Sequence, residues 1–341
     1  MNSAWRLFLE QQGARFDDHT AQDFGDPSAE IVATREGDTL ASLDQFGTLK
    51  VSGEDAQTFL QSLLSNDIRT VSPQQAQRSS FNTAKGRMLA TFLIWQRDGD
   101  YFLQLSRALT APVQKKLSMY VLRSKVKVSD VSDEFVALGI SDALLTAKLG
   151  LPESTLATTS SDAAQLIRIG DRRFQLICPA DQACAWWQRL RAESGSLHPV
   201  GAACWDWQDI HAGIPLVTLA TQEQFVPQMA NMEVIGGVNF KKGCYPGQEI
   251  VARMQYLGKA KRRMYLAHIG GDTLPRPGDT LFSNSPDENA HGLVVNAAPS
   301  PDGGFDLLGV LPIASREHNA VHLGSAAGER LDFLPLPYAL Q

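Results

Sequence analysis

The stretch Lys242-Gly243-Cys244-Tyr245-Pro246-Gly247-Gln248-Glu249 is the most informative part of this chain for its fold and its function. It places a cysteine between two glycines, and Pro246-Gly247 is a strong turn signal. Glycine adopts backbone conformations that are closed to residues with a Cβ. The pattern therefore predicts a tight loop that holds the Cys244 thiol near solvent, although most free cysteines are buried. The alternative interpretation is a turn that contains an incidental small apolar residue.

Positive charge is concentrated around this loop. Residues 241–263 contain seven lysines and arginines against Glu249 alone, a local net charge of +6 in a chain whose net charge is −6. A cationic segment on an acidic protein favours a local anion site over a general affinity for nucleic acid. The anion would be a carboxylate-bearing cofactor tail, a phosphate or an acidic partner; the alternative is a solvated surface. Lys241 and Lys242 would also favour the thiolate form of Cys244.

Length and composition indicate a soluble protein of about two domains, or three small ones. The chain has 341 residues, of which 43% are hydrophobic and 20% charged. The start, Met1-Asn2-Ser3-Ala4-Trp5-Arg6, lacks the basic and then apolar pattern of a secretory signal, and no apolar run is long enough to span a membrane. The four cysteines form no CxxC pair, so we expect no metal site, a reducing environment and a cytoplasmic location.

Hydrophobic spacing predicts mixed α and β structure followed by a small all-β domain. An apolar face repeats at helical spacing between Ala56 and Leu64, and Met88–Trp95 pairs with Tyr101–Leu105 as a hairpin. Thr110-Ala111-Pro112 opens another helix, for which we predict that Val113, Leu117, Tyr120 and Val121 point inward. After Lys261, short strand patterns alternate with turn residues. We predict an N-terminal segment at 1–30, a mixed region at 31–260 and a β domain at 261–341.

The cysteine motif resembles the signature of the YgfZ-type folate-binding proteins, which are relatives of the aminomethyltransferase (T-protein) of the glycine cleavage system. The KGCYxGQE string is highly specific, and the resemblance extends from about residue 35 to residue 341. The other matching pieces are Ser65-Asn66-Asp67, Lys85-Gly86-Arg87, Gly213-Ile214-Pro215, Phe225-Val226-Pro227-Gln228, Asn231 and Gly236-Gly237-Val238-Asn239-Phe240.

The resemblance implies an α+β fold, with packed lobes of the aminomethyltransferase type over 31–260 and a C-terminal β-barrel around a folate-binding opening. It implies Cys244 as the catalytic residue and tetrahydrofolate or a derivative as the cofactor. The folate-binding residues that it implies are Asn66, Asp67, Lys85, His211, Asn231, Lys242, Gly243, Tyr245, Gly247, Gln248, Glu249 and Arg253. It also implies transient partners among iron–sulfur enzymes or their assembly factors, with an effect on a tRNA-thiolating enzyme in some relatives.

Two positions depart from the aminomethyltransferase pattern. Where those enzymes carry a catalytic aspartate after the glycine turn, this chain has Ala90-Thr91. A threonine forms hydrogen bonds but holds no carboxylate charge beside a developing cation. Where the relatives have an acidic residue that grips the pterin, this chain has His211. We therefore expect weaker or differently arranged pterin recognition; the alternative for His211 is a half-buried helix residue.

Three functions follow from these observations. The first is a folate-binding accessory protein for iron–sulfur cluster assembly or repair, in which Cys244 acts as a nucleophile, a redox thiol or a transient cluster ligand. The second is a tetrahydrofolate-dependent aminomethyl transferase, which the missing acid at position 90 or 91 opposes. The third is a non-enzymatic module that docks an acidic partner on the basic segment. We expect no membrane and no direct nucleic-acid partner.

Overall fold

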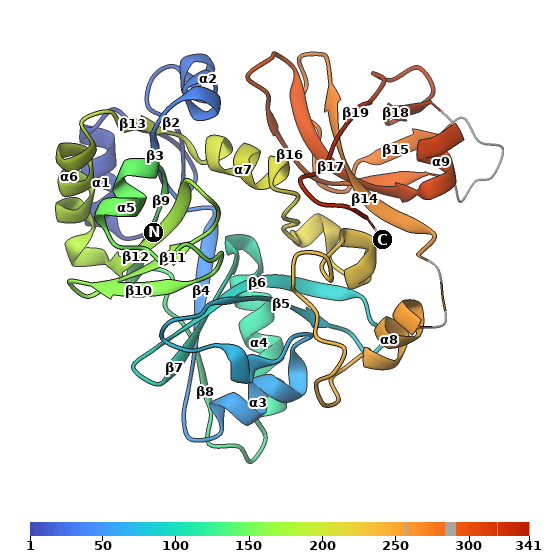
Figure 1. Cartoon of the computed structure of the whole chain (residues 1–341), viewed down its shortest axis with the longest axis horizontal. Helices are drawn as coiled ribbons and strands as arrows, with labels where there is room; N and C mark the ends of the chain where they lie inside the picture. Colours follow the sequence, from blue (N-terminus) through green and yellow to red (C-terminus); the bar gives the residue numbers. More distant parts are fainter. Residues whose placement is uncertain (257, 259, 284–290, 319, 341) are drawn as a thin grey trace. The chain divides into compact units, whose positions relative to one another are not determined.

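The computed structural model describes residues 1–256, 258, 260–283, 291–318 and 320–340. These residues form two compact units, each built from three separate stretches of the chain (Figure 1). The first unit comprises Met1–Ala56, Thr70–Gln77 and Ile94–Trp205. The second unit comprises Gln57–Arg69, Arg78–Leu93 and Asp206–Gln341. Among the described residues, no helix combines the length and the apolar character needed to cross a membrane.

The first unit contains a six-stranded sheet with two tryptophan-bearing helices in its core. In sheet order, the strands are β10 (Thr158–Ser161), β11 (Ala164–Arg168), β12 (Arg173–Pro179), β9 (Phe135–Ser141), β3 (Thr39–Ser42) and β13 (His198–Val200). Neighbours are antiparallel except β13, which pairs parallel with β3. Trp5 of α1 (Ser3–Gln11) lies edge-on to Trp187 of α6 (Ala183–Ser194), and both side chains are fully buried. The first residues of the chain thus belong to this core.

The first unit also contains β7 (Asp100–Ser106), β4 (Phe46–Ser52) and β8 (Lys127–Asp130), from a sheet of order β5-β6-β7-β4-β8. The division between the units runs through β5 (Gln77–Asn82) and β6 (Met88–Arg97). Helix α4 (Thr110–Val121) packs on β8 and β4 through Val113 and Leu117, as predicted. The prediction was wrong for Tyr120, which is 43% exposed.

Shorter elements complete the first unit and connect its sheets. They are β1 (Arg15–Asp17), β2 (Thr20–Asp23), α2 (Pro27–Glu36), the 3₁₀ turns η2 (Arg107–Leu109) and η3 (Ala180–Gln182), and α5 (Ala143–Lys148). The second unit contains nearly all of α3 (Ala56–Leu63), η1 (Ile68–Thr70), most of α7 (Ala202–His211), η4 (Leu219–Thr221), η5 (Pro227–Ala230) and α8 (Gln248–Tyr256).

The C-terminal part of the second unit is a six-stranded antiparallel sheet. In sheet order, its strands are β18 (Val321–Leu323), β15 (Thr280–Ser283), β16 (Gly292–Pro299), β17 (Phe305–Pro312), β14 (Arg262–Ile269) and β19 (Asp332–Leu334). Alternate residues, among them Ile269, Leu281 and Leu307, form its apolar core, as the period-2 pattern requires. The predicted α+β class with a C-terminal β domain is confirmed; the short helix α9 (Ile313–His318) was not foreseen.

Candidate functional site

The thiol of Cys244 is exposed on the loop that precedes α8, as the turn pattern predicted. The three other cysteines lie in different surroundings: Cys178 and Cys204 are buried, and Cys184 is half-buried. Burial raises the pKa of Cys178 to about 12. Of the four thiols, Cys244 is therefore the most accessible.

Gly247 holds the thiol loop against the turn between β5 and β6. Its φ is +79°, and a Cβ at this position would lie 2.4 Å from the carbonyl oxygen of Thr83 and 2.5 Å from the Cα of Gly86. The two glycines thus bring two backbones into contact, which no larger residue at position 247 permits. Lys85, at the tip of the same turn, is exposed.

Lys242 anchors the other end of the loop to α3. Its Nζ donates hydrogen bonds to the carbonyl oxygens of Gln61 at 2.6 Å and of Leu64, and the ammonium lies 5.0 Å from the centre of the Tyr245 ring. A cation suits these positions because the last carbonyls of a helix lack partners within the helix. Lys242 is only 5% exposed. The sequence suggested a lysine that acts on the nearby thiol, but the structure buries its ammonium against α3.

The surroundings of Lys242 act on its pKa in opposing directions. Burial is the largest cause and lowers it, the charge of Asp67 raises it, and that of Arg69 lowers it; together they bring the pKa of Lys242 to about 8. Asp67 itself accepts two hydrogen bonds from the Arg69 guanidinium, and these hold the pKa of Asp67 at about 2. Asp67 thus carries a negative charge close to the buried ammonium.

Asn66 connects the end of α3 to the glycine pair that precedes the thiol loop. Its Nδ2 donates to the carbonyl oxygen of Gly236 at 2.7 Å and to that of Arg78 at 2.9 Å. Next to it, the Ser65 hydroxyl donates to the carbonyl oxygen of Gly237 at 2.8 Å. Asn66 therefore positions the backbone upstream of Lys242 within the second unit.

Helix α8 presents the remaining predicted residues of this segment. Gln248 turns back and donates from Nε2 to the carbonyl oxygen of Lys242 at 3.3 Å, whereas Glu249 and Arg253 are exposed. Tyr245 is buried, and burial raises its pKa to about 12. Gly243 is exposed and has no neighbouring atom where a Cβ would lie. Among the described residues, Lys85, Lys241 and Arg253 are exposed cations of this site.

Asn231 is a buried residue of the scaffold. It adopts a left-handed conformation with φ of +55° after η5, and its Nδ2 donates to the carbonyl oxygen of Met264 at 2.9 Å. The same Nδ2 lies 3.4 Å from the hydroxyl of Tyr338, which donates to the carbonyl oxygen of Gly213 at 2.8 Å. Asn231 thus ties the turn that follows α7 to strand β14 and to the C-terminal segment.

His211 belongs to a cluster that the sequence analysis missed. Its ring nitrogen Nε2 lies 2.8 Å from Asp306 of β17, which also accepts from Trp207 at 2.7 Å and from His268 at 2.7 Å. Burial raises the pKa of Asp306, but the hydrogen bonds from the two histidines and from Trp207 outweigh it and hold that pKa at about 2. The available signal was an acidic residue within the apolar strand Phe305–Leu311.

Thr91 takes the place of the expected catalytic acid. It is 6% exposed, and its hydroxyl accepts a hydrogen bond from the backbone N–H of Val217 at 3.1 Å. The adjacent Ala90 is fully buried. Neither side chain carries a proton-transfer group at this position.

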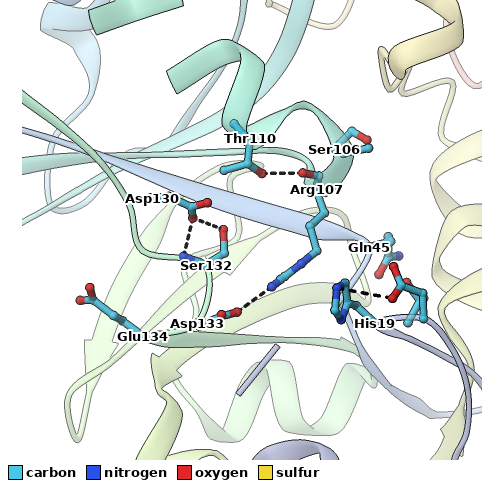
Figure 2. Close-up of a pocket in the computed structure, with 13 residues that line it drawn as sticks. His19, Gln45, Ser106, Arg107, Thr110, Asp130, Ser132, Asp133 and Glu134 are labelled. Carbon is cyan, nitrogen blue, oxygen red and sulfur yellow. Dashed lines mark hydrogen bonds and ion pairs between the residues drawn. The ribbon is translucent and has the colours of Figure 1, made fainter. Parts of the chain in front are cut away.

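A polar hollow of about 750 Å³ lies in the first unit (Figure 2). Arg107 pairs there with Asp133 at 2.6 Å, and Asp130 accepts from the Ser132 hydroxyl. The lining holds four acidic residues against one arginine, and it contains none of the predicted site residues. Within the described ranges, no three histidine, cysteine or acidic side chains are arranged to hold a metal ion.

Comparisons with known proteins agree with this architecture. Residues 9–143 match the family described as the GCVT N-terminal domain. The structure is similar to that of the glycine cleavage system aminomethyltransferase T from Bartonella henselae, with a TM-score of 0.79 over 98% of this chain and 96% of that one. Since the identity is 18%, this likeness shows the fold.

Two curated relatives, each called tRNA-modifying protein YgfZ, match almost the whole chain. The protein of Klebsiella pneumoniae (strain 342) is 29% identical over 310 residues, which cover 89% of this chain and 94% of the relative. The protein of Edwardsiella ictaluri (strain 93-146) is 30% identical over 325 residues, which cover 92% and 96%. The chain therefore belongs to the YgfZ family of GCVT-like proteins.

Proposed function

We propose that this protein is a folate-binding accessory protein that supports the assembly or repair of iron–sulfur clusters in target enzymes, including a tRNA-thiolating enzyme. The observation that carries the proposal is the exposed Cys244 on a loop held at both ends. Gly247 packs on the β5–β6 turn, and Lys242 is bonded to the last carbonyls of α3. So much packing behind one exposed thiol supports a chemical role for it.

Residues of the second unit fit a folate. The glutamate tail of a folate carries carboxylates, and the exposed Lys85, Lys241 and Arg253 carry the opposite charge. The hollow of the first unit suits them poorly, because its lining has four carboxylates against one arginine. A bound tetrahydrofolate would supply a carrier for one-carbon units, and the cations of the thiol loop would hold its tail.

The loop leaves Cys244 three chemical roles. A thiolate at this position can act as a nucleophile, as a redox thiol or as a transient ligand to a cluster. All three require an accessible sulfur, which Cys244 has and Cys178 lacks.

A tetrahydrofolate-dependent aminomethyl transferase is the second candidate, and the likeness in fold to an aminomethyltransferase favours it. The buried Thr91 counts against it, because its hydroxyl is engaged by the backbone of Val217 and holds no negative charge. General acid–base help of the missing kind is worth about 100- to 10,000-fold in rate. We expect at most a trace of glycine-cleavage aminomethyl transfer by the purified protein.

Complementation tests the proposal. Cells that lack this protein should lose activity of some iron–sulfur enzymes, most under oxidative stress, and the wild-type chain should restore it. Cys244→Ala should restore little, whereas the matched control Cys184→Ala should restore it fully. Full restoration by Cys244→Ala would point instead to a docking module that needs no thiol. Aminomethyl transfer at the rate of a true T-protein would point to the transferase.

A further inference from the structure

The exposed side of helix α4, at its C-terminal end, presents cations and large apolar side chains together. Three apolar residues protrude within four positions: Met119 is 70% exposed, Tyr120 43% and Leu122 87%. Close to them in sequence, Lys115 on the helix, Arg123 just after it and Lys127 at the start of β8 are also exposed. We call these six residues the α4 surface. It lies entirely in the first unit, whereas the thiol loop lies in the second.

The apolar face of the helix is already packed, so the exposed residues of the α4 surface are not part of an incompletely buried core. Val113 and Leu117 are buried against β8 and β4, and Gln114 donates from Nε2 to the carbonyl oxygen of Val128 at 3.2 Å. Leu122 then ends the helix with φ of +46°, in a region that branched residues rarely adopt. The helix is thus anchored on the sheet, while Met119, Tyr120 and Leu122 remain exposed at its end.

The charge of this segment is of one sign. Residues 111–129 contain five lysines and arginines and no acidic residue, a local net charge of +5. Lys125 pairs with Glu54 at 2.7 Å. Within the part of the chain that the structure describes, the other four cations make no ion pair: they are Lys115, Lys116, Arg123 and Lys127.

We propose that the α4 surface binds RNA, with the cations on phosphates and Tyr120 and Met119 against unpaired bases. Unpaired lysines and arginines on one face are the usual means of phosphate binding. An exposed aromatic among them offers a stacking platform for bases. The inference rests on the tRNA-directed part of the proposed function, gives it a surface, and replaces the expectation from the sequence that the chain has no direct nucleic-acid partner.

Two other partners fit the α4 surface less well. Lysine is depleted in the cores of protein interfaces, yet it supplies four of the five cations here. A helix that lies on a membrane must offer its apolar face to lipid, but Val113 and Leu117 are already buried against the sheet. Phosphate-rich RNA matches both the charge and the protruding tip of the helix.

Fluorescence anisotropy with labelled bulk tRNA tests the proposal on the full-length protein. We expect Lys115→Glu/Arg123→Glu to weaken binding at least about tenfold at low salt, and to lower the slope of log affinity against log salt by about 2. The matched control, Arg276→Glu/Arg330→Glu, changes the charge equally at exposed cations of the C-terminal part of the second unit and should bind nearly as wild type. Tyr120→Ala should weaken binding about tenfold with an unchanged salt slope.

Several results would overturn this inference. They are the absence of tRNA binding by the wild-type protein at low salt, equal losses in the two charge-reversed pairs, or binding to vesicles with 30% phosphatidylglycerol in place of tRNA. Lys115→Gln/Arg123→Gln repeats the test if the reversed pair fails to fold. A folate titration of the same variants separates the two proposals, and we expect their folate affinity to be unchanged. Either activity can fail alone: the protein could lose folate binding and still bind tRNA, or lose tRNA binding and still bind folate.

Discussion

Two basic segments of this chain, residues 241–263 and 111–129, carry nearly equal net charge but present it differently. In the first segment much of the charge is used inside the second unit: Lys242 is bonded to carbonyls of α3, and the buried Arg263 pairs with Glu233. In the second segment the cations point into water, and only Lys125 has an acidic partner among the described residues. A local charge count therefore locates cations but does not tell which of them can reach a ligand.

The difference arises from what each segment must connect. The first segment contacts α3, the β5–β6 turn and η5, and two of its cations are bonded there: Lys242 to a carbonyl of α3 and Arg263 to a carbonyl of η5. The second segment consists of most of α4, a turn and the start of β8; α4 has one side on a sheet, so its other side stays solvated. Anion binding at the thiol loop thus falls to Lys85, Lys241 and Arg253.

The difference in chemical reactivity between exposed and buried groups should be largest for the cysteines. We expect a limiting amount of iodoacetamide at pH 7 to label Cys244 first and Cys178 last, as mapped by mass spectrometry. Burial raises the pKa of Cys178 from 9.0 to about 12, which lowers its thiolate fraction about a thousandfold. Preferential labelling of Cys178, Cys184 or Cys204 would contradict the assignment of Cys244 as the accessible thiol.

Gly243 and Gly247, which flank Cys244, provide a matched pair of positions to test how the loop packs. Gly247→Ala should destabilise the protein by about 4 kcal/mol, because its Cβ would overlap the backbone of Thr83 and Gly86 at a positive φ. Gly243→Ala should cost less than about 1 kcal/mol, since nothing lies near its Cβ. Urea unfolding measures both values. Similar values for the two variants would show that the loop does not pack on the β5–β6 turn.

Asp306 extends the comparison to a buried carboxylate. Asp306→Asn should lower the free energy of unfolding at pH 7 by about 3 kcal/mol, because three donors lose a charged acceptor. In the wild-type protein, the folded-state pKa of about 2 lies below the ordinary 3.8. This stabilisation is therefore complete above pH 4 and declines as the pH falls toward 2, by about 2 kcal/mol. An identical acid dependence in Asp306→Asn would refute this assignment.

Lys242 should also make stability rise with pH, but in an alkaline window. Its folded-state pKa of about 8 lies below the ordinary 10.5, so the unfolded chain binds more protons between these values. Stability should therefore rise with pH in this window, by about 2 kcal/mol between pH 8 and pH 10 for this group. Other groups also titrate there, so the quantity to measure is the difference between wild type and Lys242→Met. A difference that does not change with pH would place the ammonium in water.

Turn chemistry and strand spacing predicted much of the fold and one part of the site. Pro246-Gly247 correctly predicted an exposed thiol loop, and the strands after Lys261 appear where their alternation placed them. The direction of Lys242 could not be predicted, because its carbonyl partners lie about 180 residues earlier in the chain. Asp306 and His211 are likewise joined by contacts between distant segments. Tyr120 shares the spacing of Leu117, but it lies in the last turn of α4, where spacing alone did not show its exposure.

A salt-dependent titration with tetrahydrofolate tests most directly the claim that the exposed cations of the thiol loop hold a folate tail. The measurement compares wild type with Lys241→Ala/Arg253→Ala, using ligands with one and with several glutamates. We predict that wild type binds, that affinity rises with tail length and falls with added salt, and that each lost cation weakens binding about fivefold, or about 1 kcal/mol. An affinity that changes neither with salt nor with the two substitutions, or no binding at millimolar ligand, would contradict the claim.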